Sequence, residues 1–455
     1  MTTLEHTSLI ELENASLGPR IRTLGLLALP VVGGMASQNV LNLVDTAMVG
    51  SLGDESLAAV GTASFANFVA VAFLMGLSSA VQAMASRRKG EGRLSEAAVP
   101  LNGAILIDVA IAIPLTALLV YLAPTLFPML NPSEKVAEIG VPYLTARLLS
   151  VVAIGTNFAF RGFWNGINRP GFYLRTLLIM HALNISLNWV LIYGHLGAPA
   201  LGALGAGIAS AISTFVGSAY YVSLGLRHAR HLGFLRGLPD RATLLTMARI
   251  ATPTGVQQVF FSTGFLALFW ILGRLGTSQT AAAHVLMSLT LVAILPGMGL
   301  GMAGGSLVGQ ALGRGQPDDA KRWAWDTVKL AVVVLVTIGA VMFVFPDFVL
   351  AGFLHDPDTV ELARTPLRIF GASIGLDAVG LVLIQGLLGA GASRSAMVLS
   401  VVGQWGVFLP LAYLAGPVMG WGLVGIWSAL VVQRALQALG ATILWQRGRW
   451  AKIRV

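Results

Sequence analysis

The chain has 455 residues, of which 56% are hydrophobic and only 11% are charged, and it contains no Cys. Soluble domains carry about 25% charged residues, so this composition indicates a membrane protein and excludes disulfide bonds and thiolate metal ligands. The net charge of +9 does not indicate nucleic-acid binding, because the basic residues lie in loops where membrane topology alone requires them.

Residues 1–20 hold Glu5, Glu11 and Glu13 before the first apolar run. They are unlike a cleavable signal sequence and predict a cytoplasmic tail. Twelve long apolar runs follow, and a spanning helix needs about 20 such residues. The expected spans are residues 21–49, 56–85, 96–124, 136–163, 171–194, 202–227, 242–273, 279–312, 318–346, 359–388, 393–415 and 421–446. They predict a six-helix lobe at 21–229, a basic linker at 230–241, a second six-helix lobe at 242–447 and a tail at 448–455.

The two halves repeat each other. Pro30 recurs as Pro253, 223 residues later, and Gly53 recurs as Gly276 at the same interval. An even number of spans per half makes the copies parallel repeats, related by an axis along the membrane normal. The predicted fold class is therefore an all-α membrane protein of twelve transmembrane helices in two parallel six-helix repeats. Substrate sites of repeat-built transporters lie at the repeat interface, so transport is the leading hypothesis.

The distribution of basic residues predicts the orientation. Cytoplasmic loops carry an excess of Lys and Arg, and most basic loop residues fall on one side of the expected spans. They are Arg87, Arg88, Lys89, Arg93, Arg169, Arg175, Arg227, Arg230, Arg236, Arg241, Arg314, Lys321, Arg322, Arg394, Arg447, Arg449, Lys452 and Arg454. We therefore expect a multi-pass protein of the cell (inner) membrane with both termini cytoplasmic.

The first span carries a polar stripe of Gln38, Asn42 and Asp45, spaced by four and three residues. This spacing places the side chains on one helical face. A carboxylate near the bilayer centre costs about 2.5–3.5 kcal/mol and normally faces a cavity or a partner. The alternative is that Asp45 lies near the helix end and reaches headgroup water.

The fifth span offers a matching face of His181, Asn184 and Asn188. Asn carbonyls can ligate a hard cation, and Asn amides can donate hydrogen bonds to a carboxylate. The alternative is a helix-to-helix bond without a functional role, which we favour for His181 and leave open for the two Asn residues.

The second half has no carboxylate equivalent to Asp45, because the repeat maps that position onto Leu268. Instead, Asp377 lies inside the tenth span, with Gln385 two turns further on. A carboxylate at this depth predicts a functional role. Gln38, Asn42 and Gln385 are expected to line the substrate cavity, and weaker candidates are Gln257, Gln258 and His284.

Two further intramembrane features stay open. Pro30 and Pro253 kink the first and seventh spans, which suits either a gate or a static bend. Asp108 in the third span has no polar neighbours on its face, and the sequence suggests no role for it.

No nucleotide-binding, metalloprotease or nucleophile motif is present, so an enzyme is not expected and neither is a cofactor or structural metal. Uphill transport would then draw its energy from an ion gradient. A titratable carboxylate inside the membrane lets proton or Na⁺ binding alter the preferred conformation.

Three segments resemble the multidrug and toxic compound extrusion (MATE) family. They are residues 43–50 (LVDTAMVG), the stretch from Asn184 to Trp189 followed by Tyr193 and Gly194, and residues 307–313 (LVGQALG). The resemblance implies an antiporter with two lobes around a central cleft, which exports amphipathic, often cationic organic compounds in exchange for protons or Na⁺. The expected partners are a small organic substrate and the lipid bilayer, and a monomer is expected.

The resemblance also implies residue roles. Asp45 matches the cation-coupling aspartate of the first helix, Asn184 and Asn188 match positions of the same site, and Ser210 matches a nearby hydroxyl. Asp377 matches a tenth-helix carboxylate used by one branch, although Phe261 stands where that branch has glutamate. Asp45, Asn184 and Asn188 could hold Na⁺ or act with a proton, and we favour the proton because few carboxylates remain. The alternatives are a flippase for lipids or lipid-linked precursors, which should have a strongly basic cavity, and a membrane-embedded enzyme or receptor.

Overall fold

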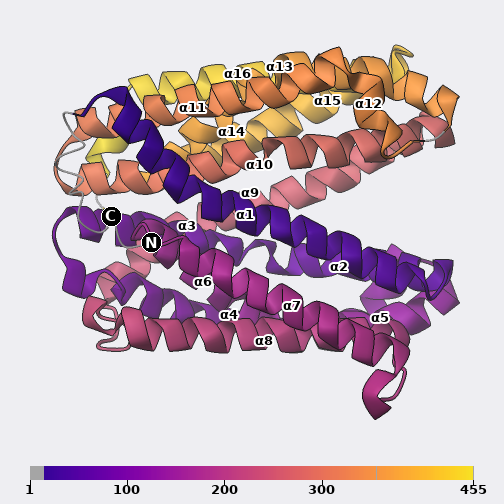
Figure 1. Ribbon diagram of the computed structural model, residues 1–455, viewed down its shortest axis with the longest axis horizontal. Coiled ribbons are helices and arrows are strands. Elements are labelled where there is room, and N and C mark those ends of the chain that lie inside the picture. Colours follow the sequence, from indigo (N-terminus) through magenta and orange to yellow (C-terminus); the bar gives the residue numbers. More distant parts are fainter. Residues whose placement is uncertain (1–14, 355, 454) are drawn as a thin grey trace. The chain divides into compact units, whose positions relative to one another are not determined.

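The computed structural model describes residues 15–354, 356–453 and 455, and every regular element within them is helical (Figure 1). The first half contains α1 (Leu17–Gly50), α2 (Asp54–Ala72), α3 (Met75–Gly90), α4 (Val99–Leu130), α5 (Glu134–Leu148), α6 (Val151–Gly166), α7 (Gly171–Tyr193) and α8 (Gly202–His228). The second contains α9 (Arg241–Gly273), α10 (Thr277–Gly313), α11 (Pro317–Val344), α12 (Pro346–Ala351), α13 (Pro357–Gly389), α14 (Ser393–Val401), α15 (Leu409–Tyr413) and α16 (Gly422–Gln446). Short 3₁₀ segments are η1 (Leu94–Glu96), η2 (His195–Gly197), η3 (Arg230–Leu232) and η6 (Arg449–Lys452), and the π segments η4 (Val402–Phe408) and η5 (Leu414–Val418) flank α15.

The expected number of membrane spans is confirmed. Within the described residues, eleven helical runs are long and apolar enough to cross a membrane, and there are twelve if α5 and α6 count as one span bent by 47°. The bend falls at Leu149 and Ser150, where the Ser150 hydroxyl donates to the main-chain carbonyl of Arg147 at 2.7 Å. The protein is therefore a multi-pass membrane protein.

The parallel repeat is visible in the backbone of equivalent loops. Gly53 and Gly276 precede α2 and α10 with φ of 106° and 101°, in a region of conformational space that disfavours residues with a Cβ. Gly202 and Gly422, which begin α8 and α16, share a φ of 56°. Equivalent loops therefore fold alike in the two halves.

Equivalent helix contacts support the same conclusion. A Cβ added to Gly205 would lie 2.5 Å from the main-chain oxygen of Leu191, and one added to Gly425 would lie 2.6 Å from that of Ala415. Each glycine thus lets the last helix of its half approach the preceding helical segment closely, which is how small residues drive helix association in membranes.

The described chain forms two compact units, and three helices, α1, α3 and α9, contribute to both. The first unit contains the described residues up to Val32, the segment Lys89–Gly92 and the described part of the segment Val259–Val455, so most of it belongs to the second half of the chain. The second unit contains Gly33–Arg88 and Arg93–Gln258. The unit boundaries cut through α1 and α9, the helices that carry Pro30 and Pro253, and through the end of α3. The lobe boundaries expected at residues 229 and 242 stay a prediction.

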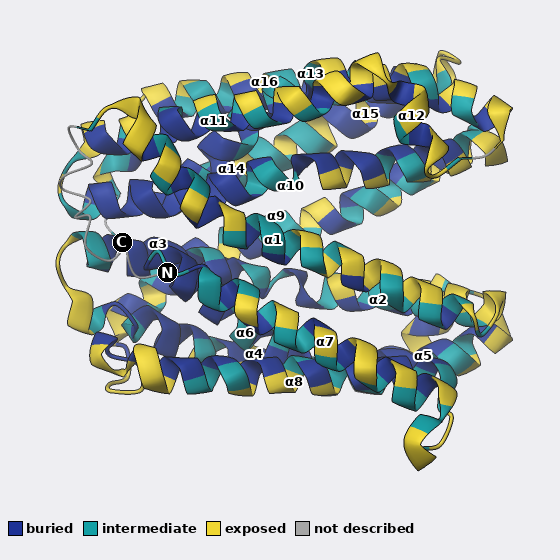
Figure 2. Cartoon of the chain, in the orientation of Figure 1, coloured by how far each residue is buried: buried dark blue, intermediate teal, exposed yellow. Residues whose placement is uncertain are grey.

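The first unit has its core among α10, α11, α13 and α16, which pack side by side (Figure 1). Trp323 and Ile374 are fully buried there. The carboxyl-terminal part of α10, from Gly299 to Leu312, is buried without interruption and is dark blue in Figure 2. By contrast, exposed apolar side chains such as Leu29 and Val333 occur along the spans, as expected of surfaces that face lipid.

In the second unit, α7 packs on α8 and α4 packs on α6. The contact between α3 and α6 is especially close, because a Cβ on Gly162 would lie 2.1 Å from the main-chain oxygen of Ser78. These contacts position α7 and α8 beside the second part of α1, where the sequence predicts the coupling site.

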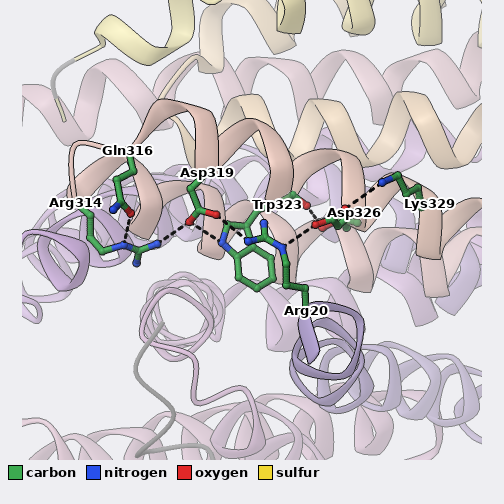
Figure 3. A network of polar contacts seen from close by, with 8 residues as sticks. Arg20, Arg314, Gln316, Asp319, Trp323, Asp326 and Lys329 are labelled. Carbon is green, nitrogen blue, oxygen red and sulfur yellow. Dashed lines mark hydrogen bonds and ion pairs between the residues drawn. The ribbon is translucent and has the colours of Figure 1, made fainter. Parts of the chain in front are cut away.

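The helix α1 begins at Leu17, inside the predicted tail of residues 1–20, of which residues 1–14 lie outside the described residues. A buried charge network explains why these residues are ordered (Figure 3). Arg20 donates to Asp319 at 2.8 Å and to Asp326 at 2.7 Å, and its guanidinium lies 3.8 Å from the ring centre of Trp323. All three partners lie on α11, so the start of α1 is fixed to the first unit.

Candidate coupling site

Asp45 of α1 meets the polar face of α7. The side-chain amide of Asn188 donates to Asp45 Oδ1 at 2.6 Å and is also within 3.1 Å of Asn184 Oδ1. Asn184 and Asn188 are buried, whereas Asp45 is partly exposed. The two helical faces predicted from spacing alone therefore come together at a carboxylate and two amides.

The helix α8 supplies the hydroxyl groups of the site. The amide nitrogen of Asn184 lies 3.1 Å from Ser210 Oγ and 3.3 Å from Ser213 Oγ. Turned by half a rotation, the same amide would place its NH₂ group 3.0 Å from Asp45 Oδ1, and its carbonyl would accept from the main-chain N–H of Ser210 at 3.2 Å. In that orientation the carbonyl also accepts from Ser210 Oγ at 3.1 Å, so Asn184 bonds to the Asp45 carboxylate and to the Ser210 hydroxyl together. Ser213 was not expected from the sequence, although its spacing of three from Ser210 places both on one face.

A second set of contacts joins α1 and α7 around His181. Its Nε2 lies 3.2 Å from Gln38 Oε1, its Nδ1 lies 2.6 Å from Ser37 Oγ, and the Gln38 amide donates to Asn42 at 3.1 Å. Because a carbonyl oxygen only accepts, Nε2 donates in this arrangement. The preferred interpretation of His181 as a bond between helices fits these contacts.

The charge of Asp45 is not neutralised by direct contact. No ion pair within 4 Å involves Asp45 in the part of the chain that the structure describes. Arg147 of α5 interacts with it electrostatically from further away. Asn188 Oδ1 is buried and has no hydrogen-bond partner. The site thus combines a carboxylate with an uncommitted amide oxygen, and both groups can accept a proton donor or a hard cation.

Asp377 has a different environment from Asp45. It is 2% exposed on α13, and its Oδ1 lies 3.0 Å from Nε of Arg434 on α16. Both atoms nevertheless lack a well-aligned hydrogen bond, so this is a close ion pair without hydrogen-bond geometry. Arg434 was not expected from the sequence, although a lone Arg at the centre of an apolar span is a signal of an intramembrane partner.

The remaining candidates lie on α9, α10 and α13. Gln258 contacts Met75 Sδ at 3.4 Å, His284 stacks on Phe269, and the side chain of Gln385 packs against Gly301. Gln257 is partly buried on α9 next to Gln258. Their assignment to a substrate cavity stays a prediction, as does gating by Pro30 and Pro253, both of which lie inside continuous helices.

Known proteins resemble this chain over nearly its whole length. The sequence model of the MatE family matches residues 30–190 and again residues 253–414, once in each repeat. This chain is a member of the MatE family. The expected resemblance is therefore confirmed, and the MatE family consists of transporters and not enzymes.

Among curated MatE relatives, the Brucella suis protein named "Probable multidrug resistance protein NorM" is 29% identical over 435 residues, which cover 92% of this chain and 91% of the relative. The Pasteurella multocida protein of the same name is 28% identical and covers 91% of both chains.

Solved structures confirm the fold. A structure described as the outward-facing conformation of a multidrug resistance MATE family transporter matches with a TM-score of 0.88 at 21% identity and covers 97% of this chain and 98% of its own. A transporter structure from Pyrococcus furiosus matches with a TM-score of 0.86 at 21% identity and covers 98% of this chain and 99% of its own. This MatE protein thus has the two-repeat helical fold expected from its sequence.

Proposed function

We propose that this MatE protein is a secondary active antiporter that exports amphipathic, often cationic organic compounds in exchange for protons or Na⁺. Family membership and the naming of its relatives as multidrug resistance proteins support export of small molecules. The flippase alternative is not favoured by the comparisons. The intramembrane Arg434 also gives it little support, because it is paired with Asp377 and forms no basic cluster there.

The observation that carries the proposal is the setting of Asp45. This carboxylate lies in a membrane helix, accepts a short hydrogen bond from Asn188 and has no direct ion-pair partner among the described residues. Burial of such a charge is costly, so binding a proton or Na⁺ changes the energy of any conformation that encloses it. Coupling requires this differential binding between conformations.

The test is export from proteoliposomes driven by an imposed ion gradient. Asp45→Asn should reduce gradient-driven export of an organic cation to the background of empty vesicles and leave thermal unfolding unchanged. Asp54→Asn is the matched control, since Asp54 is an exposed acid in the first turn of α2, and it should export normally. Normal export by Asp45→Asn would overturn the proposal.

We favour the proton as the coupling ion. The donor set of one carboxylate and two amides also suits Na⁺, with Asp45, Asn184 and Asn188 as its ligands. Export measured at fixed pH under a Na⁺ gradient, with a protonophore present, separates the two ions. Robust export under these conditions would identify Na⁺.

The orientation in the inner membrane and the monomeric state belong to the same proposal. Because the chain has no Cys, a single introduced Cys is the only thiol available for labelling. Gly237→Cys in the exposed linker should react only with membrane-permeant reagents in intact cells, and Ser133→Cys before α5 should also react with impermeant ones. The reverse pattern would place both termini outside. Light scattering of the detergent-solubilised protein measures its oligomeric state.

A further inference from the structure

Asp108 is a buried carboxyl group that the proposed coupling site does not use. It is the only charged residue of α4 and is 0% exposed. Its Oδ2 accepts a hydrogen bond from the hydroxyl of Thr156 on α6 at 2.9 Å, and its Oδ1 has no hydrogen-bond partner. The adjacent Gly155 makes room for the carboxyl group, because a Cβ there would lie 1.8 Å from Oδ1.

No cation in the described residues forms an ion pair with Asp108. The helices with the largest contact to α4 are α5 and α6. The helix α9 also meets α4, because a Cβ on Gly103 would lie 2.7 Å from Met247 Sδ, and its charged residues are Arg241 and Arg249. The charged residues of α5 are Glu134, Lys135 and Glu138 in its first turns and Arg147 in its last, and α6 has Arg161. Arg147 acts on Asp45, and Arg161 donates to Ser78. A fully buried carboxylate without a counter-charge is costly, so this environment favours the neutral acid of Asp108.

A band of polar side chains leads from Asp108 towards Asp45 within the same unit. Next to Thr156, the Asn157 carbonyl accepts from Ser218 of α8 at 2.8 Å. One turn earlier on α8, Thr214 donates to the main-chain carbonyl of Ser210 at 2.7 Å. Ser210 in turn bonds to Asn184 of the coupling site. The α8 portion from Ser210 to Ser218 spans about 12 Å at the rise of an α-helix.

The band is polar throughout, but it is not a continuous chain of side-chain hydrogen bonds. Thr156 and Asn157 are joined through the backbone, and Ser218 reaches Thr214, and Thr214 reaches Ser210, through main-chain oxygens. Proton passage along the band would need bridging water at these three steps, and polar sites of this kind can bind water. The hydroxyl groups of Thr214 and Ser218 can both donate and accept at either side of such a water.

We infer that Asp108 is a second proton-binding group of this unit, which exchanges its proton with the Asp45 site along the polar band. The Asp108 carboxylic acid gives up its proton and becomes a carboxylate, and the Asp45 carboxylate accepts a proton and becomes the acid, with no change of oxidation state. This inference rests on the proposed proton coupling at Asp45. It gives Asp108 a role that a purely structural bond to Thr156 would not have.

The first test is infrared difference spectroscopy of the purified full-length protein during a pH step. Asp108→Asn keeps the side-chain volume and an oxygen that accepts the hydrogen bond from the Thr156 hydroxyl, but the Asn amide cannot take up a proton as a carboxylate does. The wild type should show two protonated-carboxyl bands that respond to pH, Asp108→Asn should lose one, and Asp45→Asn should lose the other. A spectrum of Asp108→Asn identical to that of the wild type would overturn the inference.

The second test measures export in proteoliposomes as a function of pH. Asp108→Asn should shift the pH of half-maximal export by about one unit relative to the wild type. Ser218→Ala interrupts the band without changing either carboxyl group, and it should shift the pH of half-maximal export in the same direction as Asp108→Asn. If Asp108→Asn does not fold, Ser218→Ala alone tests whether the band carries the proton. Thr116→Val is the matched control, because Thr116 lies on α4 and bonds only to the main chain of Leu148; its profile should be unchanged.

The outcomes separate this inference from the proposed function. If Asp45→Asn exports normally, proton coupling at Asp45 is wrong. If Asp45→Asn stops export while Asp108→Asn and Ser218→Ala both keep the wild-type profile, only the role of Asp108 is wrong.

Discussion

Arg434 Nε lies 3.0 Å from Asp377 Oδ1, so a carboxylate and a guanidinium neutralise each other inside the membrane-spanning part of the protein. The acid is 2% exposed, and the Arg434 side chain is 20% exposed. Any ion or substrate that binds Asp377 must therefore compete with a cation that is part of the chain, and the site differs in this respect from Asp45.

Removing one member of this pair should destabilise the protein more than removing both. Arg434→Gln leaves a buried carboxylate without its counter-charge and should cost about 3–5 kcal/mol in the free energy of unfolding. The double variant Arg434→Gln with Asp377→Asn should recover most of this loss. Unfolding in detergent measures both, and an equal loss in the single and double variants would show that the pairing itself is unimportant.

Asn188→Ala should weaken ion coupling at Asp45. It removes a hydrogen bond to a charged group, which is worth about 1.5–3 kcal/mol, so export at a fixed gradient should fall by about tenfold or more. Asn39→Ala provides the comparison on α1, because that amide bonds only to the main chain of Met35. Similar losses from both substitutions would contradict a special role for Asn188.

Arg20→Met should destabilise the first unit. Arg20 is the cation that joins Asp319 and Asp326 (Figure 3), and the substitution removes it. Asp319 keeps its ion pair with Arg314 at 2.9 Å. We expect a loss of about 3 kcal/mol, at the lower end of the range for broken buried pairs. Lys135→Met breaks an exposed ion pair, in which the Lys135 side chain is 73% exposed and the Glu55 side chain is 56% exposed. It should change the free energy of unfolding by less than about 1 kcal/mol. Thermal unfolding of the two variants compares them directly.

Gly162→Ala should destabilise the second unit, because the new Cβ would overlap the main-chain oxygen of Ser78. Overpacking of this kind costs about 1–3 kcal/mol. Gly61→Ala introduces the same methyl group on exposed α2, with nothing within 4 Å, and should be neutral or stabilising by about 0.5–1 kcal/mol through helix propensity. A stable Gly162→Ala variant would mean that α3 and α6 can separate at little cost.

The start of α13 should weaken in acid. The hydroxyl and main-chain N–H of Thr359 hold the pKa of Asp356 below its usual range, so this cap stabilises the folded state above the unfolded pKa of about 3.9. Its contribution is lost as the pH falls through the lower folded-state pKa. Amide exchange of Thr359 should therefore accelerate on acidification, relative to the intrinsic rate. In Asp356→Asn, which keeps a capping oxygen, protection should not depend on pH in this range.

From the sequence alone we could predict the membrane spans, the parallel repeat, the family and the two polar faces of α1 and α7. The spans and the polar faces follow from composition and local periodicity, since side chains three or four residues apart share a helical face wherever the helix is placed. The repeat follows from residues that recur 223 positions apart, and the family from three segments that resemble it. The meeting of Asp45 with Asn188 could be anticipated because each face carried several polar residues.

Which distant residues become partners depends on the tertiary structure. Arg434 with Asp377, Ser213 with Asn184, and Arg20 with Asp319 come from different helices, and no local pattern pairs them. Their contacts depend on how each helix is rotated and how closely it approaches its neighbours, which small residues such as Gly162 and Gly205 control through packing. For the same reason, the division of α1 between two compact units could not be predicted from an apolar run that is continuous in sequence.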